Sequence, residues 1–230
     1  MIIKIKLPLS NAYLIKGDQP VLVDTGSPGD IKRLEKALAR EGLAFSDLAV
    51  ILHTHAHGDH AGSTHEIAHT YNIATALHPA DNMMARTGRT NPTPTRLAAS
   101  IMKPFVNKPF MPFSPEIALY DGFSLAEYGI PARVIHTPGH TPGSVSVLFQ
   151  NGQAIVGDVM MGGHMGGFFQ PTRPRYHYFA EDLNAVHQSI HRLLALNVEE
   201  FYVGHGGPLM RKDVLARFSL VLPRVVGIEM

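Results

Sequence analysis

The chain has 230 residues, enough for one substantial domain with a buried core. Hydrophobic residues make up 45% of the sequence and charged residues 17%, which is ordinary for a globular protein. The formal net charge of +1 gives no reason to expect a nucleic-acid partner, and no apolar run approaches the roughly 18 residues of a membrane span. The N-terminus lacks the continuous apolar stretch of a signal peptide, so we expect a cytoplasmic protein without a membrane partner.

The sequence contains no cysteine, which excludes disulfides, thiolate metal ligands and a cysteine nucleophile. It contains fourteen histidines. Histidine is the commonest metal ligand and the usual acid–base group near neutral pH. The grouping of these histidines along the chain therefore decides what kind of site to expect.

Short strands and helices alternate in the first eighty residues. Apolar runs between turn residues predict strands over Ile2–Leu7, Ala12–Lys16, Pro20–Asp24, Leu48–Leu52 and Ile73–Leu77. The spacing of apolar residues predicts helices over Asp30–Arg40 and Ser63–Tyr71.

The stretch Asp81–Pro115 differs in composition from the rest of the chain. It contains six prolines and several basic residues, and the pattern predicts only one short helix, around Thr95–Met102. We expect this stretch to be an insertion or lid over the main body, so that residues 1–230 form a single domain.

Strands and helices interleave again in the second half. Strands are predicted over Ala132–His136, Ser144–Gln150, Gln153–Gly157 and Glu200–Val203, and a helix over Glu181–Leu196. Between them, Met160–Tyr178 is rich in glycine, methionine and aromatic residues and is predicted to be a loop. The interleaving throughout the chain indicates the α/β class.

The densest group of metal-ligand residues follows an apolar strand in the segment ILHTHAHGDHAG (Ile51–Gly62). A regular strand would place His55, His57 and Asp59 on one side. The start of a helix would then turn His60 back beside Asp59. Four nitrogen and oxygen ligands packed this closely exceed what one tetrahedral ion needs once other ligands join, so two ions are the natural interpretation.

Three further ligand-type residues each lie where an apolar strand stops. His140 lies in the turn TPGHTPGS (Thr137–Ser144), Asp158 follows an apolar strand directly, and His205 lies in GHG (Gly204–Gly206). A histidine among glycines and prolines is often only a turn residue. Because all three are placed at strand ends, together they are stronger evidence for a metal site than any one of them is alone.

These pieces, together with VDTG at Val23–Gly26, resemble the ordered motifs of the metallo-β-lactamase superfamily. They extend over most of the chain and leave Asp81–Pro115 unmatched. The resemblance implies an αββα four-layer sandwich with the site at one edge, between the two sheets. It is closer to glyoxalase II or the lactonases than to a true β-lactamase.

The resemblance also implies roles for seven metal ligands: His55, His57 and His140 for the first ion, Asp59, His60 and His205 for the second, and Asp158 as the bridge between them. Asp24 matches an acidic position near the site, where it would orient a ligand histidine. The alternative is that Asp24 is an ordinary turn aspartate at a strand end.

The expected chemistry is hydrolysis. Two divalent ions about 3.5–4 Å apart lower the pKa of a shared water from about 16 towards 7. We expect a dinuclear hydrolase in which a metal-bridging hydroxide attacks a small-molecule ester or thioester. Asp59 is the candidate general acid or water-orienting group, and Asp158 is the catalytic bridging carboxylate. Two zinc ions per chain fit the ligands best, and Mn, Fe and Co use similar ligands.

The sequence departs from several branches of the superfamily. The carboxylate at Asp158 is unlike the β-lactamases and resembles hydrolases such as glyoxalase II. His57 stands where the flavodiiron oxidoreductases carry a glutamate, which argues against redox chemistry. Acyl-homoserine lactonases have a tyrosine three residues after the bridging aspartate, whereas this chain has Met161.

Two alternatives stay open: a lactonase acting on a hydrophobic acyl lactone, and a metal-binding protein without catalysis. Side chains that follow Asp158 either line an apolar pocket or fill the core: Met160, Met161, Met165, Phe168, Phe169, Tyr176 and Tyr178.

Four polar residues after Asp158 are candidate substrate contacts: His164 and His177, and, for a carboxylate or phosphate, Arg173 and Arg175. The helical histidines, including His187 and His191, are expected to face solvent. An apolar C-terminal stretch, Phe218–Ile228, either packs on the body or pairs two subunits, so a homodimer is one of the expectations.

Overall fold

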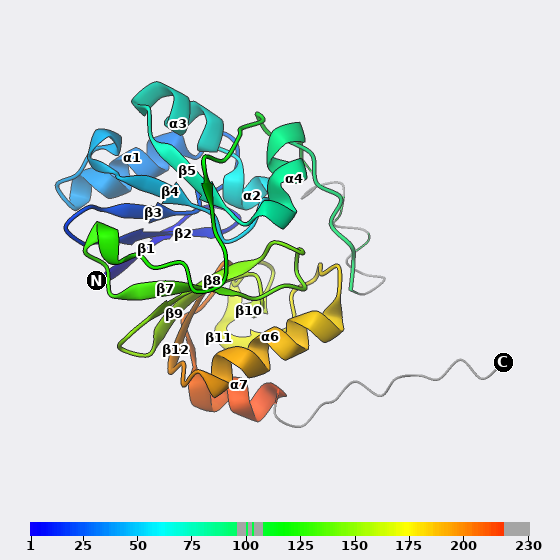
Figure 1. The fold of residues 1–230 in the computed structure, drawn as a ribbon. Coiled ribbons are helices and arrows are strands. Elements are labelled where there is room, and N and C mark those ends of the chain that lie inside the picture. Colours follow the sequence, from blue (N-terminus) through cyan, green and yellow to red (C-terminus); the bar gives the residue numbers. More distant parts are fainter. Residues whose placement is uncertain (96–99, 101–102, 104–107, 219–230) are drawn as a thin grey trace.

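The computed structural model describes residues 1–95, 100, 103 and 108–218, and within them two β-sheets pack face to face with helices on both outer sides (Figure 1). The expected αββα sandwich is therefore confirmed. The helix predicted around Thr95–Met102 lies almost entirely outside the described residues, as does the C-terminal stretch beyond Phe218.

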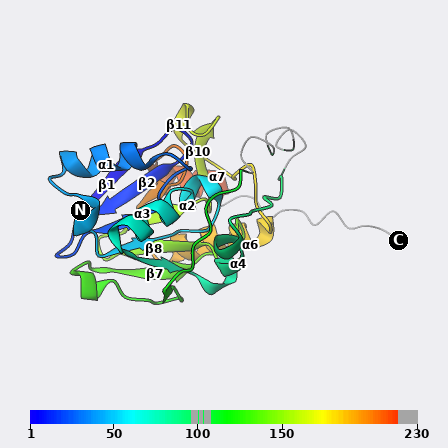
Figure 2. The ribbon, with the colours of Figure 1, turned by 90° about the horizontal axis from the view of Figure 1, so that it is seen from above.

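The first sheet has six strands in the described part of the chain, in the order β1 (Ile2–Lys6), β2 (Asn11–Ile15), β3 (Val21–Val23), β4 (Val50–Leu52), β5 (Ala74–Leu77) and β6 (Ile117–Ala118). β1, β2 and β3 pair antiparallel, and β3 to β6 pair parallel. On its outer side lie α1 (Ile31–Arg40) and α3 (Thr64–Tyr71), as the sequence predicts (Figure 2). The short η1 (Phe45–Asp47) leads towards β4.

The second sheet has five described strands, in the order β13 (Leu209–Met210), β12 (Glu200–Val203), β9 (Gln153–Gly157), β8 (Val145–Phe149) and β7 (Ala132–His136). β12 and β9 are parallel and the other neighbours are antiparallel. Its outer face is covered by α6 (Leu183–Ala195) and α7 (Arg211–Phe218), and the short η3 (Ala126–Tyr128) precedes β7.

Alternating side chains explain the layers, because successive residues of a strand point to opposite faces. In β4, Val50 and Leu52 face the second sheet in one apolar cluster, whereas Ile51 faces α1 and α3 in another. A third cluster joins β7, β8, β9 and β12 to α6 and α7. In the order given, these clusters lie between the two sheets, between the first sheet and its helices, and between the second sheet and its helices.

The segment predicted as a loop after Asp158 instead contains a β-hairpin, β10 (Met161–His164) and β11 (Phe169–Arg175). The sequence does not predict this hairpin, because β10 contains Gly162 and Gly163 and β11 contains two prolines. Proline cannot donate to a ladder, and a two-stranded hairpin has outward edges where that loss is tolerated.

The stretch Asp81–Pro115, predicted to be an insertion or lid, starts at the last residue of η2 (Pro79–Asp81) and continues into α4 (Asn82–Thr87). Ala85 packs there with Phe110 and Phe113 in a small apolar cluster. The role of a lid stays a prediction. Across the described residues, no helix has both the length and the apolar character needed to cross a membrane.

Polar segments meet at one edge of the sandwich. β3, β4 and β5 are parallel, so the residues that follow them leave the first sheet at the same edge. β7, β9 and β12 likewise run in one direction in the second sheet. The metal-ligand candidates of the sequence all follow strands of these two groups.

Asp81, the last residue of η2, ties two of these loops together. Its buried carboxylate accepts hydrogen bonds from the backbone N–H of Ala56 at 3.1 Å, the backbone N–H of Gly143 at 2.7 Å and the hydroxyl of Thr141 at 2.8 Å. Ala56 lies between His55 and His57, and Thr141 follows His140. Burial raises the pKa of Asp81 to about 6, against the effect of its three hydrogen bonds.

Replacing Asp81 with asparagine should destabilise the ion-free protein by about 1–3 kcal/mol, because the new NH₂ group must face a buried N–H or O–H donor. Urea unfolding in the presence of a chelator measures this loss. Asp18→Asn, at an exposed carboxylate, is the control and should change the free energy of unfolding by less than about 0.5 kcal/mol.

The effect of Asp81→Asn should also depend on pH. The folded state holds the Asp81 proton more tightly than the unfolded chain, where an aspartate has a pKa near 3.9, so this group's contribution to stability falls as pH rises from about 4 to about 6. Asparagine lacks this dependence. The stability difference between wild type and variant should therefore be largest near pH 4 and narrow above pH 6, and a difference that widened with pH would contradict the raised pKa.

Candidate metal centre

The first four candidate ligands follow β4, but not in the geometry that a continued strand predicts. β4 ends at Leu52, so His55 and His57 project from a loop. Asp59 and His60 belong to the short helix α2 (Gly58–Ala61), which does turn His60 back beside Asp59, as expected. The expectation of a strand through His55, His57 and Asp59 is therefore wrong, although all three side chains reach the same site.

His140 is presented by the tight turn between β7 and β8. Gly139 has a φ of 130°, and a Cβ there would lie 2.3 Å from the backbone nitrogen of Val186 in α6. The turn therefore needs glycine next to His140, both for its backbone conformation and for its close approach to α6.

Asp158 and His205 follow the neighbouring parallel strands β9 and β12. A Cβ on Gly157 would lie 2.7 Å from the side chain of Thr54, and one on Gly204 would lie 2.6 Å from His60 Cε1. The glycines of the GD and GHG motifs thus let the ends of these strands approach the histidine loop of the first sheet.

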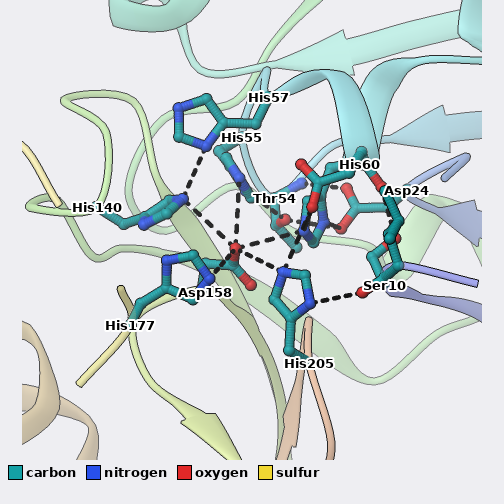
Figure 3. A network of polar contacts seen from close by, with 12 residues as sticks. Ser10, Asp24, Thr54, His55, His57, His60, His140, Asp158, His177 and His205 are labelled. Atoms are coloured by element: carbon teal, nitrogen blue, oxygen red, sulfur yellow. Dashed lines mark hydrogen bonds and ion pairs between the residues drawn. The ribbon is translucent and has the colours of Figure 1, made fainter. Parts of the chain in front are cut away.

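The structure brings all seven predicted residues together at this edge. Figure 3 labels all of them except Asp59. Their nitrogen and oxygen atoms form overlapping groups, each with ligand atoms within 4.8 Å of one another: His55, His57 and His140; Asp59, His60 and His205; and His55, His60 and Asp158. The first two groups match the two sets implied by the superfamily resemblance, and Asp158 lies between them.

One oxygen of Asp158 is at the centre of this arrangement (Figure 3). Asp158 Oδ2 lies 3.2 Å from His205 Nε2, 3.4 Å from the Nε2 atoms of His60 and His140, and 3.9 Å from His55 Nε2. Two ligands that are each about 2.1 Å from a tetrahedral ion lie about 3.4 Å apart. The observed spacings therefore suit nitrogen and oxygen ligands around shared cations.

Several of these atoms also lack a partner. Within the described residues, four buried atoms of the cluster have no hydrogen bond: His55 Nε2, His60 Nε2, His205 Nε2 and Asp158 Oδ1. Buried polar atoms in proteins are nearly all paired. Cations between these atoms would remove the cost of burying them, so the residues present fit a metal centre.

The electrostatics of the cluster divide the histidines into two kinds. Burial lowers the pKa of His57 and His140 to about 3 and that of His55 well below its usual value, so these rings are neutral and can donate lone pairs. Burial has the same tendency at His60 and His205, but Asp158 and Asp59 outweigh it and raise the pKa of both rings. A cation binding at His60 and His205 would take over the role of those protons.

Hydrogen bonds behind the ligands fix their orientation. The buried Asp24 carboxylate accepts from His60 Nδ1 at 2.8 Å and from the backbone N–H and the hydroxyl of Thr54, each at 2.8 Å. Asp24 therefore makes the contact to a ligand-type histidine that the resemblance implies. His140 Nδ1 and His205 Nδ1 lie 2.8 Å and 2.7 Å from the backbone oxygens of Phe179 and Leu9. Such contacts leave the Nε2 lone pairs directed into the site.

His177 is a member of the cluster that the sequence identified only as a candidate substrate contact. Its Nε2 lies 3.4 Å from Asp158 Oδ2, and it groups with His140 and Asp158 as a further set of ligand-type atoms. No spacing motif marks it, because it lies in the irregular segment between β11 and α6. The other candidate from this region, His164, does not line the site.

A cavity of about 400 Å³ opens onto these residues. Besides His57, Asp59, Asp158, His177 and His205, its lining is mainly apolar: Pro8, Leu9, Pro92, Met161, Met165 and Tyr178. No lysine or arginine occurs among the described residues that line it. A larger cavity of about 760 Å³ lies beside His65 and Glu116 and contains none of the seven ligand candidates.

The methionine and aromatic side chains that follow Asp158 therefore separate into those that line the cavity and those that do not. Met161, Met165 and Tyr178 line the cavity, whereas Met160 is in the core and Phe168 and Phe169 are exposed. Tyr176 packs against the core that contains α6 and α7.

Two further substrate candidates, Arg173 and Arg175, and one helical histidine, His187, do not lie where the sequence suggested. Arg173 is exposed and bonds to Gln170, and neither it nor Arg175 lines the cavity. The prediction that His187 faces solvent is wrong, because its ring is buried and lies 2.8 Å from the hydroxyl of Tyr176.

Known protein sequences match this chain. The profile of the metallo-beta-lactamase superfamily matches residues 6–205. A probable metallo-hydrolase of Methanocaldococcus jannaschii is 30% identical over 201 residues, which cover 86% of this chain and 87% of that protein. A probable metallo-hydrolase of Bacillus subtilis is 27% identical over 238 residues, covering 96% and 89%.

Solved structures agree with these relatives. The crystal structure of BLEG-1 B3 metallo-beta-lactamase has a TM-score of 0.71 and 27% identity, covering 97% of this chain and all of that one. A protein crystallised in a di-iron-bound form has a TM-score of 0.68 and 27% identity, covering 95% and 98%. The profile match spans most of the chain and includes every candidate ligand, and the chain belongs to the metallo-β-lactamase superfamily.

Proposed function

We propose that this protein is a dinuclear metal-dependent hydrolase that cleaves an ester or thioester of a small, uncharged, apolar molecule. The observation that carries the proposal is the position of Asp158 Oδ2, within 3.9 Å of histidine nitrogens from both ligand sets. One carboxylate between two groups of imidazoles is an arrangement that suits a pair of bridged cations.

The ligands would divide as the superfamily resemblance implies. His55, His57 and His140 would hold one ion, and the second set, Asp59, His60 and His205, would hold the other. Neutral imidazoles and carboxylates favour zinc, with manganese, iron and cobalt as alternatives. When bound, two such ions supply Lewis acidity and, by lowering the pKa of water, hydroxide at neutral pH.

The chain's own residues would orient the reaction. Asp59 borders the cavity, and its Oδ2 lies 3.5 Å from His205 Nε2. This carboxylate is placed to orient water or to move a proton towards a leaving group in the cavity. Asp24 holds His60 from behind, and Phe179 holds His140 through its backbone oxygen. These contacts keep the ligand rings from rotating.

The cavity supports the choice of substrate. Leu9, Met161, Met165 and Tyr178 offer apolar surface to an acyl or alkyl group. A strongly anionic substrate would find no described lysine or arginine in the lining to pair with it. The same observation favours a second candidate, a hydrophobic acyl lactone, since a lactone is a cyclic ester with the same apolar requirement.

A substrate panel tests the proposed reaction. Protein loaded with zinc or manganese should hydrolyse neutral aryl or alkyl esters, acyl thioesters or acyl lactones, with kcat/KM rising as the acyl chain lengthens from two to eight carbons. Carboxylated esters and phosphodiesters should be much poorer substrates. Two bound ions per chain with no turnover of any compound would show a metal-binding protein without catalysis and would contradict the proposal.

Replacing Asp158 with asparagine should lower metal content and hydrolysis together. The loss in kcat/KM should exceed the roughly 10–100-fold cost of disturbing an outer partner of a ligand, because a shared ligand of both ions is removed. Asp18→Asn is the matched control and should keep both properties. Unchanged activity and metal content in Asp158→Asn would show that this carboxylate does not bridge the ions.

A further inference from the structure

His177 completes a ring of imidazoles around the Asp158 carboxylate (Figure 3). Its ring stacks on His205 at a centroid distance of 5.1 Å and meets His140 edge-on at 4.7 Å. His140 in turn meets His55 at 4.6 Å, and His55 meets His60 at 4.3 Å. His177 therefore fills the gap between a residue of the first ligand set and a residue of the second.

The distance from His177 to the bridging oxygen equals that of accepted ligand candidates. His177 Nε2 lies 3.4 Å from Asp158 Oδ2, the same distance as for His60 and His140. The nitrogens of His177 and His140 and the oxygen of Asp158 all lie within 4.8 Å of one another, so one ion can contact all three.

Hydrogen bonding to Asp158 cannot by itself explain so many nearby nitrogens. A carboxylate oxygen has about two lone-pair sites, whereas five histidine Nε2 atoms, including that of His177, lie within 3.9 Å of Asp158 Oδ2. Three of these five nitrogens, those of His55, His60 and His205, have no hydrogen-bond partner among the described residues, and a cation inside the ring would pair them.

The far side of the His177 ring is held by the backbone of Phe179. Its Nδ1 lies 3.1 Å from the backbone oxygen of Phe179, the oxygen that His140 Nδ1 approaches at 2.8 Å. The backbone N–H of Phe179 also donates to His177 Nδ1, at 3.2 Å, so the backbone of Phe179 fixes the ring with its Nε2 towards Asp158 and the site. The same short stretch of backbone thus orients both rings.

We propose that His177 is a sixth histidine ligand of the centre, binding the ion held by His140 and Asp158 on the side that faces the cavity. The proposal rests on the metal centre proposed above and extends it beyond the seven residues implied by the superfamily motifs. His177 would raise the number of protein ligands on that ion and occupy a position otherwise open to water.

Metal binding by variants of the full chain tests this assignment. His177→Ala should weaken the affinity for one of the two ions at least tenfold in competition with a chromophoric zinc chelator, and should alter the visible absorption of the cobalt-loaded protein. His164→Ala removes the neighbouring histidine of the same region, which does not line the site, and should leave both measurements unchanged. Equal zinc affinity and an equal cobalt spectrum in His177→Ala would overturn the proposal, even if substrate turnover fell.

A measurement on the wild-type protein avoids the risk that a variant folds poorly. Each histidine bound to paramagnetic cobalt contributes one strongly shifted ring N–H signal in the proton NMR spectrum. The superfamily motifs supply five such histidines: His55, His57, His60, His140 and His205. Six signals, with one lost in His177→Gln, are expected; five signals would overturn the assignment. Wild-type protein that bound no cobalt pair at all would instead contradict the dinuclear centre itself.

Discussion

The carboxylate of Asp158 is the constraint on which the rest of the site depends. It is buried at the end of a central strand of the second sheet, and histidines from four separate segments point at it. Burial alone would raise the pKa of Asp158, but His205, His177 and His60 hold it well below its usual value. A buried charge with this many nitrogen neighbours is costly unless cations complete the charge balance and pair the remaining atoms.

The fold brings these side chains together through the placement of strand ends, glycines and buried hydrogen bonds. Two sheets of parallel and antiparallel strands end at one edge, and glycines allow the strand ends to come closer than any side chain would permit. Asp81 then joins the His55–His57 loop to the His140 turn, and Asp24 fixes His60. Loops held at both ends in this way keep ligand atoms a few ångströms apart, as a metal centre requires.

Much of this could be predicted from the sequence, since the informative residues lie at strand ends or in dense local patterns. The layers follow from strand and helix periodicity, and the candidate ligands from HAHGDH and three strand-end motifs. Residues whose role comes only from tertiary contact could not be assigned. His177 and Asp81 carry no local pattern, the β10–β11 hairpin is hidden by glycine and proline, and His187 is buried against Tyr176 from outside its own helix.

A dinuclear centre around Asp158 can be located by anomalous diffraction from crystals soaked in zinc, measured on both sides of the zinc absorption edge. Two bridged cations should give two peaks on either side of Asp158, one among His55, His57 and His140 and the other among Asp59, His60 and His205. A single peak, or peaks that leave Asp158 without a metal neighbour, would contradict this dinuclear centre.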